Sequence, residues 1–458
     1  MSTAWSPGGV TEPRSAVTGL AWPALPDSVG ASLLAVHYQL AQSEWWPTTR
    51  LEEASFRQLA VVLGHARDTV PAYRERLGGL PVDDPRALAA HWHSIPLLRR
   101  TDVQTLGEAL HSRAVPADHG RSIEYHTSGS TGRPLRGLET ELSHFFFGAL
   151  NLREHLWQRR DLGGTFAAVR TQVDDARLPG WGRAVEAVFD TGPALTLPIH
   201  TPVERQLDWL LENDPDYLLT HPSNLRALLL AARERGVTPV RLRGLGSFGE
   251  QLPADLRALC REVWGLPLAD VYSCEEAGYL ALQCPQAPEH YHVQAENVFV
   301  EVLDDKGTPC PPGASGEVVL TTLHNLAMPL IRYAIGDFAE AGAPCPCGRG
   351  LPVLQRIHGR ARNLVRLPDG SRHWPSFPAE DWLAIAPVRQ FRLRQTDIGR
   401  IEVELVASRA LEAAQEQALE DMLRARLGYA FDIALHPVTA IERGAGGKFE
   451  DFVSELGD

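Results

Sequence analysis

A short run of hydroxyl residues and glycines is the stretch of this sequence best suited to chemistry. Thr127 to Pro134 reads Thr-Ser-Gly-Ser-Thr-Gly-Arg-Pro. Glycine lets the backbone approach a ligand closely and adopt positive φ, so the loop can present backbone N–H groups together with side-chain hydroxyls. Such a loop can wrap a polyphosphate, although it lacks the spacing of the common P-loop. Taken alone, the run is more simply a solvated turn.

Further motifs follow this run. They are Ser247 to Gln251, Tyr-Ser-Cys-Glu-Glu at Tyr272 to Glu276, Arg-Tyr-Ala-Ile-Gly-Asp at Arg332 to Asp337, Gly359-Arg360, and Gly446-Gly447-Lys448. Each is weak alone, but together they resemble the motifs of the adenylate-forming enzymes (acyl-CoA synthetases and adenylation domains) in that family's order. Over roughly residues 45–458 the chain resembles the phenylacetate–CoA ligase-like branch.

The resemblance implies a reaction in two steps. A carboxylic acid, by analogy with the branch an aromatic one, reacts with ATP to give acyl-AMP and pyrophosphate, and the acyl group then passes to CoA. Two anions must meet in the first step, so the site needs positive charge and hydrogen-bond donors around the phosphates. A carrier-protein thiol or an amine is the alternative acceptor. A non-catalytic nucleotide-binding protein is the rival of another class.

The resemblance also assigns roles to single residues. Glu276 would hold Mg²⁺, because hard cations prefer oxygen ligands. Asp337 would accept hydrogen bonds from the ribose hydroxyls, and Lys448 would neutralise charge that develops during adenylation. For each, an ordinary surface or turn residue is the alternative. The other implied nucleotide-binding residues are Ser128, Gly129, Ser130, Thr131 (also catalytic) and Gly132 in the loop, Gly249, Glu250 and Tyr272 around the adenine, and Arg360.

The sequence departs from the family's pattern at three positions. Leu135 stands where many relatives carry lysine, which narrows the resemblance to the phenylacetate-type branch. Arg362 replaces the hinge aspartate, so the pivot of a mobile lid stays open. Glu275 replaces a small hydroxyl residue, and whether it adds charge to the metal site is open. A nucleophilic Cys274 is set aside, because the neighbouring glutamates would raise its pKa.

Cysteine and histidine form a second constellation. Cys345 and Cys347 flank one proline, and Cys284 lies upstream, shortly before His290 and His292. Three thiolates and one imidazole make a closed tetrahedral Zn²⁺ site. We therefore expect a structural zinc ion on Cys284, His292, Cys345 and Cys347, as in some relatives of the branch. His290 is the alternative fourth ligand, and reduced cysteines without metal are the alternative to the site itself.

Composition bounds the class of protein. The chain has 458 residues, of which 44% are hydrophobic and 22% charged, as in a soluble enzyme of two or three domains. Its net charge of −13 argues against nucleic acid or an anionic membrane as partner. Residues 1–30 lack a signal pattern, and six cysteines make no disulfide framework in so long a chain. We expect a cytoplasmic protein, and the branch suggests a homodimer.

Helices and strands alternate through the middle of the chain. Helices are expected over 50–77, 141–157, 203–211, 223–235 (capped by Ser223) and 253–263, and strands over 216–220, 242–248 and 268–272. This alternation predicts a parallel sheet covered on both faces, with ligand loops at the carboxyl ends of its strands. Beyond residue 297, hairpins are expected at 298–302 with 316–323 and around 368–370, then strands near 390–395, 400–407 and 431–440 and a helix over 410–427.

The predicted fold is therefore α/β. A flexible lead-in (1–44) precedes a large AMP-binding domain (45–358), whose parallel sheet is flanked by helices and whose β subdomain covers about 285–358. A small, mobile α+β lid (359–458) follows.

Overall fold

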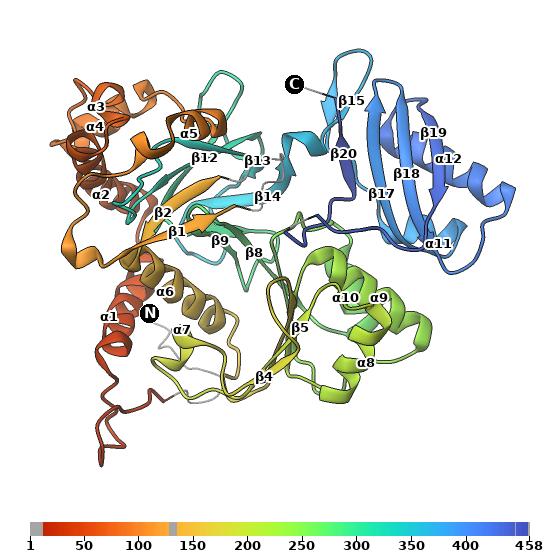
Figure 1. Ribbon diagram of the computed structural model, residues 1–458, viewed down its shortest axis with the longest axis horizontal. Helices are drawn as coiled ribbons and strands as arrows, with labels where there is room; N and C mark the ends of the chain where they lie inside the picture. The colour runs from red at the N-terminus through yellow and green to blue at the C-terminus, as the bar shows by residue number, and fades with distance from the viewer. Residues whose placement is uncertain (1–11, 128–134, 445, 457–458) are drawn as a thin grey trace. The chain divides into compact units, whose positions relative to one another are not determined.

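The computed structural model describes residues 12–127, 135–444 and 446–456. Ser128, Gly129, Ser130, Thr131 and Gly132 of the expected phosphate loop therefore lie outside the described residues. The chain divides into two compact units, which share it in alternating segments (Figure 1). Unit 1 comprises Met1–Phe166, Arg177–Leu195 and Ala269–Ile357, and unit 2 comprises Ala167–Ala176, Thr196–Leu268 and His358–Asp458.

Antiparallel strands form the sheet of unit 1. Their order is β11 (Val298–Leu303), β12 (Ser315–Thr322), β13 (Tyr333–Ala341), β14 (Val353–Arg360), β10 (Tyr291–Val293), β9 (Gly278–Gln283) and β8 (Leu268–Cys274). The expected hairpin beyond residue 297 is the antiparallel pair β11 and β12. A second, smaller hairpin joins β1 (Ser122–His126) to β2 (Arg136–Thr140) on either side of the phosphate loop.

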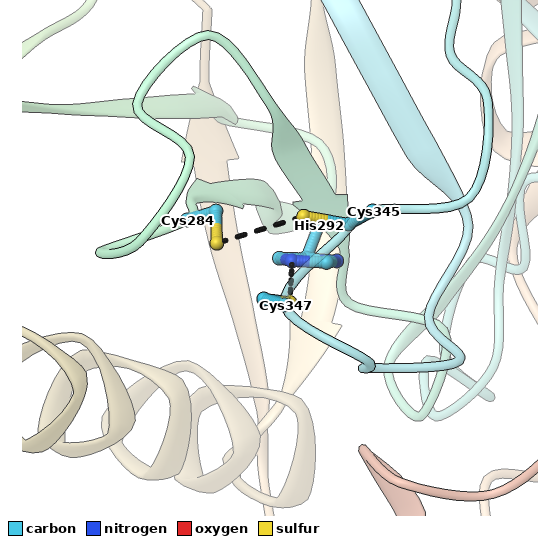
Figure 2. A group of neighbouring side chains, drawn as sticks. All are labelled: Cys284, His292, Cys345 and Cys347. Carbon is cyan, nitrogen blue, oxygen red and sulfur yellow. Dashed lines mark hydrogen bonds between the residues drawn. The ribbon is translucent and has the colours of Figure 1, made fainter.

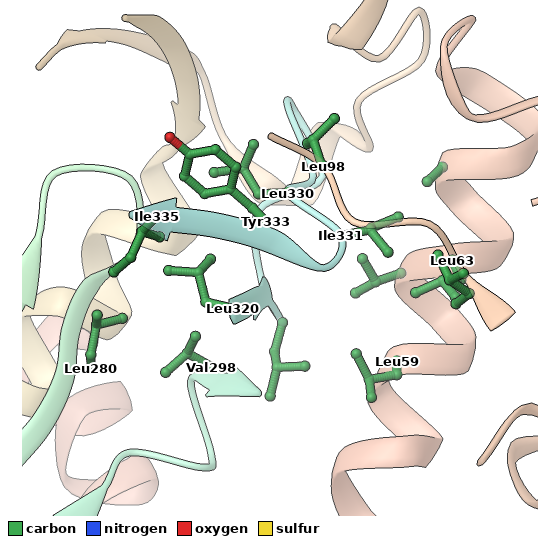
Figure 3. Packing of buried hydrophobic residues seen from close by; sticks show 14 of the residues in the cluster. Leu59, Leu63, Leu98, Leu280, Val298, Leu320, Leu330, Ile331, Tyr333 and Ile335 are labelled. Carbon is green, nitrogen blue, oxygen red and sulfur yellow. The ribbon is translucent and has the colours of Figure 1, made fainter. Parts of the chain in front are cut away.

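Helix α2 (Thr48–Thr69) covers this sheet with the predicted apolar stripe. Leu59 and Leu63 are fully buried in one cluster with strand residues such as Leu320 (Figure 3). The expected single helix over 50–77 is broken, because Pro71 holds the preceding Val70 in an extended conformation. The helical turn α3 (Tyr73–Arg76) follows the break.

The lead-in is more ordered than expected. Helix α1 (Ser28–Ser43) occupies most of the second half of residues 1–44, and its Leu33 is buried in a cluster with Ala149 and Leu152. Both partners belong to helix α6 (Glu141–Trp157), whose bounds are those predicted. The prediction of a flexible lead-in was therefore wrong for α1, because its apolar face was overlooked beside the Pro- and Gly-rich residues before it.

Unit 2 contains the predicted alternation of strands and helices. Strands β6 (Tyr217–Thr220) and β7 (Gly244–Phe248) pair in parallel, and β3 (Phe166–Arg170) and β5 (Ala194–Pro198) extend the sheet in the order β7-β6-β3-β5. The intervening helices are α8 (Val203–Asn213), α9 (Pro222–Arg235) and α10 (Leu256–Trp264). Ser223 is not the cap of α9, because Pro222 occupies the first turn and His221 the cap position.

The C-terminal part of unit 2 is an α+β layer. Its sheet has the order β19 (Asp432–Pro437), β18 (Arg400–Ala407), β17 (Val388–Asp397) and β20 (Phe452–Ser454), and helices α11 (Ala379–Ile385) and α12 (Ala413–Leu427) share its buried cluster. Strand β20 was not predicted, and β19 is therefore not the last strand. β20 is only three residues long, yet its parallel pairing with β17 fixes the chain directly after Lys448.

The predicted lid, residues 359–458, lies wholly in unit 2, which also takes in segments 167–176 and 196–268 of the expected large domain. Buried Arg226 explains part of this grouping, because it pairs with Asp451 at 3.0 Å and with Asp255 at 3.2 Å. Among the described residues, no helix is both long and apolar enough to cross a membrane.

Candidate active site and metal cluster

In unit 1, the expected ribose carboxylate meets the expected adenine tyrosine. The hydroxyl of Tyr272 on β8 donates a hydrogen bond of 2.9 Å to Oδ2 of Asp337 on β13. Both side chains are nearly buried, with 7% and 9% of their surface exposed. Gly336 adopts φ +82° just before Asp337, a conformation that favours glycine. Tyr272 is therefore buried like an ordinary core tyrosine, the alternative considered for it, and it also orients the carboxylate of Asp337.

The two ends of the expected phosphate loop are tied together. The Leu135 amide donates to Oγ1 of Thr127 at 2.9 Å, and the Thr127 amide donates to the Leu135 carbonyl at 2.9 Å. Arg100, on helix α5 (Arg100–Leu106), donates to the same Thr127 hydroxyl at 3.3 Å. The sequence did not single out Arg100, because a helical arginine distant in sequence carries no motif. Its guanidinium supplies positive charge at the base of the loop.

Glu276 lines a cavity of about 180 Å³ within unit 1. It lies in the connection between β8 and β9, together with Glu275, and both residues form part of the cavity wall. The other contributors include β2, which supplies Glu139, and α6, which supplies His144 and Phe147. Glu139 was not predicted, since a glutamate in an alternating strand reads as a solvated residue. Cys274 also lines this cavity. Burial and Glu276 raise the pKa of its thiol well above the ordinary value, which argues against Cys274 as a nucleophile.

In unit 2, Lys448 lies beside the expected adenine-pocket segment. Gly249 has φ +80°, and a Cβ placed on it would lie 3.8 Å from Cε of Lys448 and 3.1 Å from Cε1 of His221. Glycine is therefore required here both by the backbone and by the close approach. Lys448 itself is exposed, so its ammonium is available to a ligand.

Glu250 anchors the segment that carries this lysine. One of its carboxylate oxygens accepts from the Phe449 amide at 2.7 Å and from Nη1 of Arg443 at 3.1 Å, and the other accepts from the Ser223 amide at 3.0 Å. The Glu250 side chain is only 3% exposed, and burial raises its pKa while Arg443 favours the charged form. Its contact with adenine stays a prediction, and the structure gives its carboxylate a positioning role that the motif did not suggest.

The expected hinge motif is bonded to the same segment. Arg360 ends β14, and its amide donates to the Asn363 side chain at 2.9 Å. Arg362, the residue that replaces the hinge aspartate, pairs with Glu450 at 2.6 Å, and Asn363 donates to the same carboxylate at 3.0 Å. Arg362, which departs from the family's pattern, is thus paired with Glu450, two residues beyond Lys448.

The predicted metal ligands converge in unit 1 (Figure 2). Cys284 follows β9, His292 lies on β10, and Cys345 and Cys347 lie in the turn before β14. All four ligand atoms lie within 4.8 Å of one another, with 3.8 Å between the sulfurs of Cys284 and Cys345 and 3.4 Å between Cys347 Sγ and His292 Nε2. Sulfur ligands at about 2.3 Å from zinc would lie ~3.8 Å apart in a tetrahedron. His292, and not the alternative His290, belongs to the group.

The chemistry of this cluster suits a soft divalent metal. Burial, followed by Arg349, lowers the pKa of His292 to about 4, so its imidazole is neutral. Burial raises the pKa of Cys347, but hydrogen bonds to its sulfur, the first of them from the Arg349 amide at 3.4 Å, together lower it and favour the thiolate. Arg349 also pairs with Glu44 at 3.2 Å and so joins the cluster to the end of α1. Four protein ligands leave no open position, as in structural zinc sites.

Known proteins resemble this chain along almost its whole length. A phenylacetate-coenzyme A ligase of Thermus thermophilus is 25% identical over 448 residues, covering 88% of this chain and 96% of that protein. A phenylacetate-coenzyme A ligase of Escherichia coli is 23% identical over 418 residues, covering 86% and 93%. No model of a known protein family matches the chain.

Solved structures share the fold. A 2-hydroxyisobutyryl-CoA ligase in the postadenylation state superposes with a TM-score of 0.71 at 19% identity, covering 91% of this chain and 92% of the other. An anthranilate CoA ligase superposes with a TM-score of 0.53 at 17% identity, covering 71% and 65%. The chain is thus similar to phenylacetate-coenzyme A ligases over most of its length and shares the fold of these CoA ligases, which supports the superfamily and branch that the motifs indicated.

The predicted site residues are divided between the two units. Unit 1 carries Glu276, Asp337 and Tyr272, and unit 2 carries Lys448 with the segment at Gly249. The α/β fold class is confirmed. The individual roles of these residues in ATP binding and catalysis remain predictions.

Proposed function

We propose that the chain is an AMP-forming carboxylate–CoA ligase that activates a compact carboxylic acid. The observation that carries this proposal is the similarity to a phenylacetate-coenzyme A ligase, which covers 88% of the chain and extends through both units. The cavity beside Glu276, at about 180 Å³, is smaller than the ~300–1,000 Å³ typical of pockets for drug-sized ligands. A single aromatic ring or a short aliphatic chain suits such a space.

In the first step, a carboxylate oxygen of the acid attacks the α-phosphorus of ATP. The bond from that phosphorus to the bridging oxygen breaks, and pyrophosphate leaves with the electron pair. Lys448 offsets the negative charge that grows at the phosphorus, while Asp337, held by Tyr272, orients the ribose. Mg²⁺, when bound by Glu276, would neutralise the phosphates.

In the second step, the thiol of CoA attacks the acyl carbonyl and AMP leaves, giving the thioester. Adenylation and thioester formation need different groups at the acyl carbonyl, so the segment around Lys448 would withdraw between them. Its anchors on Glu250 and Arg362 are hydrogen bonds and ion pairs, which can exchange for water at modest net cost.

We further propose that Cys284, His292, Cys345 and Cys347 hold a structural zinc ion. The proposal is supported by the 3.8 Å spacing of two sulfurs and by the neutral imidazole of His292. The ion would tie the end of β9, strand β10 and the turn before β14 together. It would take no part in the reaction, because no ligand position remains for substrate.

Pyrophosphate and AMP release from ATP and Mg²⁺, measured across a panel of aryl and aliphatic acids with and without CoA, tests the function. We expect acid-dependent pyrophosphate release in either case, and multiple turnovers of AMP only with CoA. Turnover without CoA when an amine is supplied would show that an amine is the acceptor. Turnover only with a carrier protein would show that a carrier-protein thiol is the acceptor. No release with any acid would overturn the ligase and favour a nucleotide-binding protein.

A further inference from the structure

The cavity beside Glu276 has an unusual balance of charge. Three of its wall residues are carboxylates, Glu139, Glu275 and Glu276. Among the described residues that line it, no lysine or arginine is present to offset them. An acid that enters this space brings a further negative charge, which the described part of the wall does not offset with a lysine or arginine.

The metal accounts for one side of this charge. Glu276 is the proposed ligand of Mg²⁺, and Glu275 is its direct neighbour in the connection between β8 and β9. A divalent ion at this connection can offset both carboxylates. Glu139 belongs to a separate element, β2, which leads directly into helix α6. A cation there must come from elsewhere.

Among the described residues, a single ion pair of Glu139 is found. Its side chain is only 27% exposed, and burial raises its pKa, with Glu275 acting in the same direction. Within the part of the chain that the structure describes, its ion-pair partner is His144 at 3.7 Å, whose side chain is 66% exposed. A partly desolvated carboxylate on a cavity wall gains free energy from a cationic ligand.

The rest of the wall suits the body of a small aromatic or aliphatic group. Phe147 lines the cavity and packs against Tyr279 with ring centroids 5.0 Å apart, and His324 stacks on Phe146 at 3.7 Å. Phe147 and His324, the two of these rings that line the cavity, offer flat surface beside the acidic groups. A ligand that matches the cavity therefore has a compact body with a carboxylate at the Glu276 end and a positive charge at the Glu139 end.

We propose that the acid activated by this enzyme carries an amino group, and that Glu139 binds it as an ammonium ion. This inference rests on the proposed ligase function and names its substrate class, an amino-bearing carboxylic acid of one ring or a short chain. Glu139 is then the residue that sets specificity, because a charge-assisted hydrogen bond in a confined site discriminates strongly against uncharged analogues.

Matched pairs of acids test the proposal. Pyrophosphate release is measured with para-(aminomethyl)benzoate against para-(hydroxymethyl)benzoate, and with short ω-amino acids against their ω-hydroxy analogues. The pair that the wild-type enzyme uses faster decides the test. In that pair we expect the wild-type enzyme to favour the amino-bearing acid, and Glu139→Gln to lower the kcat/KM for that acid roughly 10- to 100-fold. The hydroxy analogue should be unaffected by the substitution. The exposed Glu53→Gln on α2 is the control of equal charge change.

Binding of the same benzoate pair, measured by calorimetry without ATP, separates the two hypotheses. Equal or better use of the hydroxy acids overturns the inference and leaves the ligase intact. If no acid releases pyrophosphate, the proposed ligase function is wrong, and the binding measurement alone tests whether Glu139 binds an amino group. The inference is upheld if the aminomethyl compound binds, Glu139→Gln abolishes this binding and Glu139→Asp retains it. It is overturned if both compounds of the pair bind equally or if neither binds. A changed Mg²⁺ requirement in Glu139→Gln, with unchanged acid preference, also overturns it.

Discussion

Tyr272 and Asp337, on two strands of the unit 1 sheet and far apart in sequence, meet in a hydrogen bond of 2.9 Å. The tyrosine hydroxyl donates, so the carboxylate is held as an acceptor through Oδ2. A buried carboxylate that the protein already orients loses less conformational entropy on binding two ribose hydroxyls than a mobile carboxylate would. We therefore predict that the tyrosine positions the carboxylate for the nucleotide.

Asp337→Asn should raise the KM for ATP roughly 10- to 100-fold, because two charge-assisted hydrogen bonds to the ribose are weakened. Tyr272→Phe should raise it less, by loss of orientation alone. Steady-state kinetics with saturating acid provide the measurement. The control is Tyr291→Phe, which removes a similar buried bond, of 2.8 Å, from a tyrosine to Asp270. An equal rise in that variant would mean that general destabilisation, not nucleotide binding, is being observed.

Lys448 is one of only two lysines in the chain, the other being Lys306 in the turn between β11 and β12. Lys448→Ala should lower the adenylation rate by ~10²–10³, as loss of one transition-state stabiliser does. Lys306→Ala should leave the rate unchanged. Because the chain has no other lysine, an amine-selective reagent followed by mass spectrometry can also report protection of Lys448 by ATP. An unchanged adenylation rate in Lys448→Ala would refute its role.

Glu250→Gln should release the segment around Lys448, because the neutral amide weakens the bonds from Arg443 and Phe449. We expect adenylation to slow by roughly tenfold, the effect of losing one charge-assisted hydrogen bond. Thioester formation from supplied acyl-AMP and CoA should change little, since it does not need that lysine in place. The matched control is Glu262→Gln, whose carboxylate pairs with Arg233 and is 51% exposed. Equal loss in both half-reactions would contradict the positioning role.

The protein as purified should contain about one zinc ion per chain, as a site with four protein ligands does. Cys345→Ser should remove the ion and lower the midpoint of thermal unfolding, while Cys310→Ser, outside the cluster, should do neither. Elemental analysis and calorimetry measure the two effects. A zinc-free wild-type protein with the same stability before and after chelator treatment would exclude the site.

Stability should fall as the pH drops from about 6.5 to about 4. Burial is the main cause that lowers the pKa of His155 to about 3 and those of His37, His221 and His324 to about 4. The unfolded chain takes up protons on these groups below ~6.5 while the native state resists them, so each costs up to ~1.4 kcal/mol per pH unit in that window.

Urea unfolding at several pH values in this window measures that slope. His155→Gln should flatten it, whereas the exposed His91→Asn should not. A slope that is the same in wild type and His155→Gln would mean that other groups govern the acid sensitivity.

Local patterns in the sequence predicted elements with clear short-range periodicity, such as helix α6 and the parallel strands β6 and β7. The same holds for the cysteine cluster, where ligand chemistry limits the alternatives. Strands β9, β10, β13 and β14 of unit 1 were not predicted. Tertiary packing decided the rest. Pro71 divides one apolar stripe into two helices, and β20 exists only because β17 offers an edge. Glu139 and the anchoring role of Glu250 could not be predicted, since each depends on elements distant in sequence.

The cysteine cluster also has a consequence for how the chain reaches its native state. Cys284 and Cys347 bracket strands β10, β11, β12 and β13, so the ligands enclose four strands of the unit 1 sheet in a single closed loop. Closing a long loop is entropically slow, and a metal captured early would hold its ends together while the strands between them pair. We therefore expect the yield of folded protein during synthesis to depend on the zinc supply of the cell, although the proposed ion would take no part in the reaction.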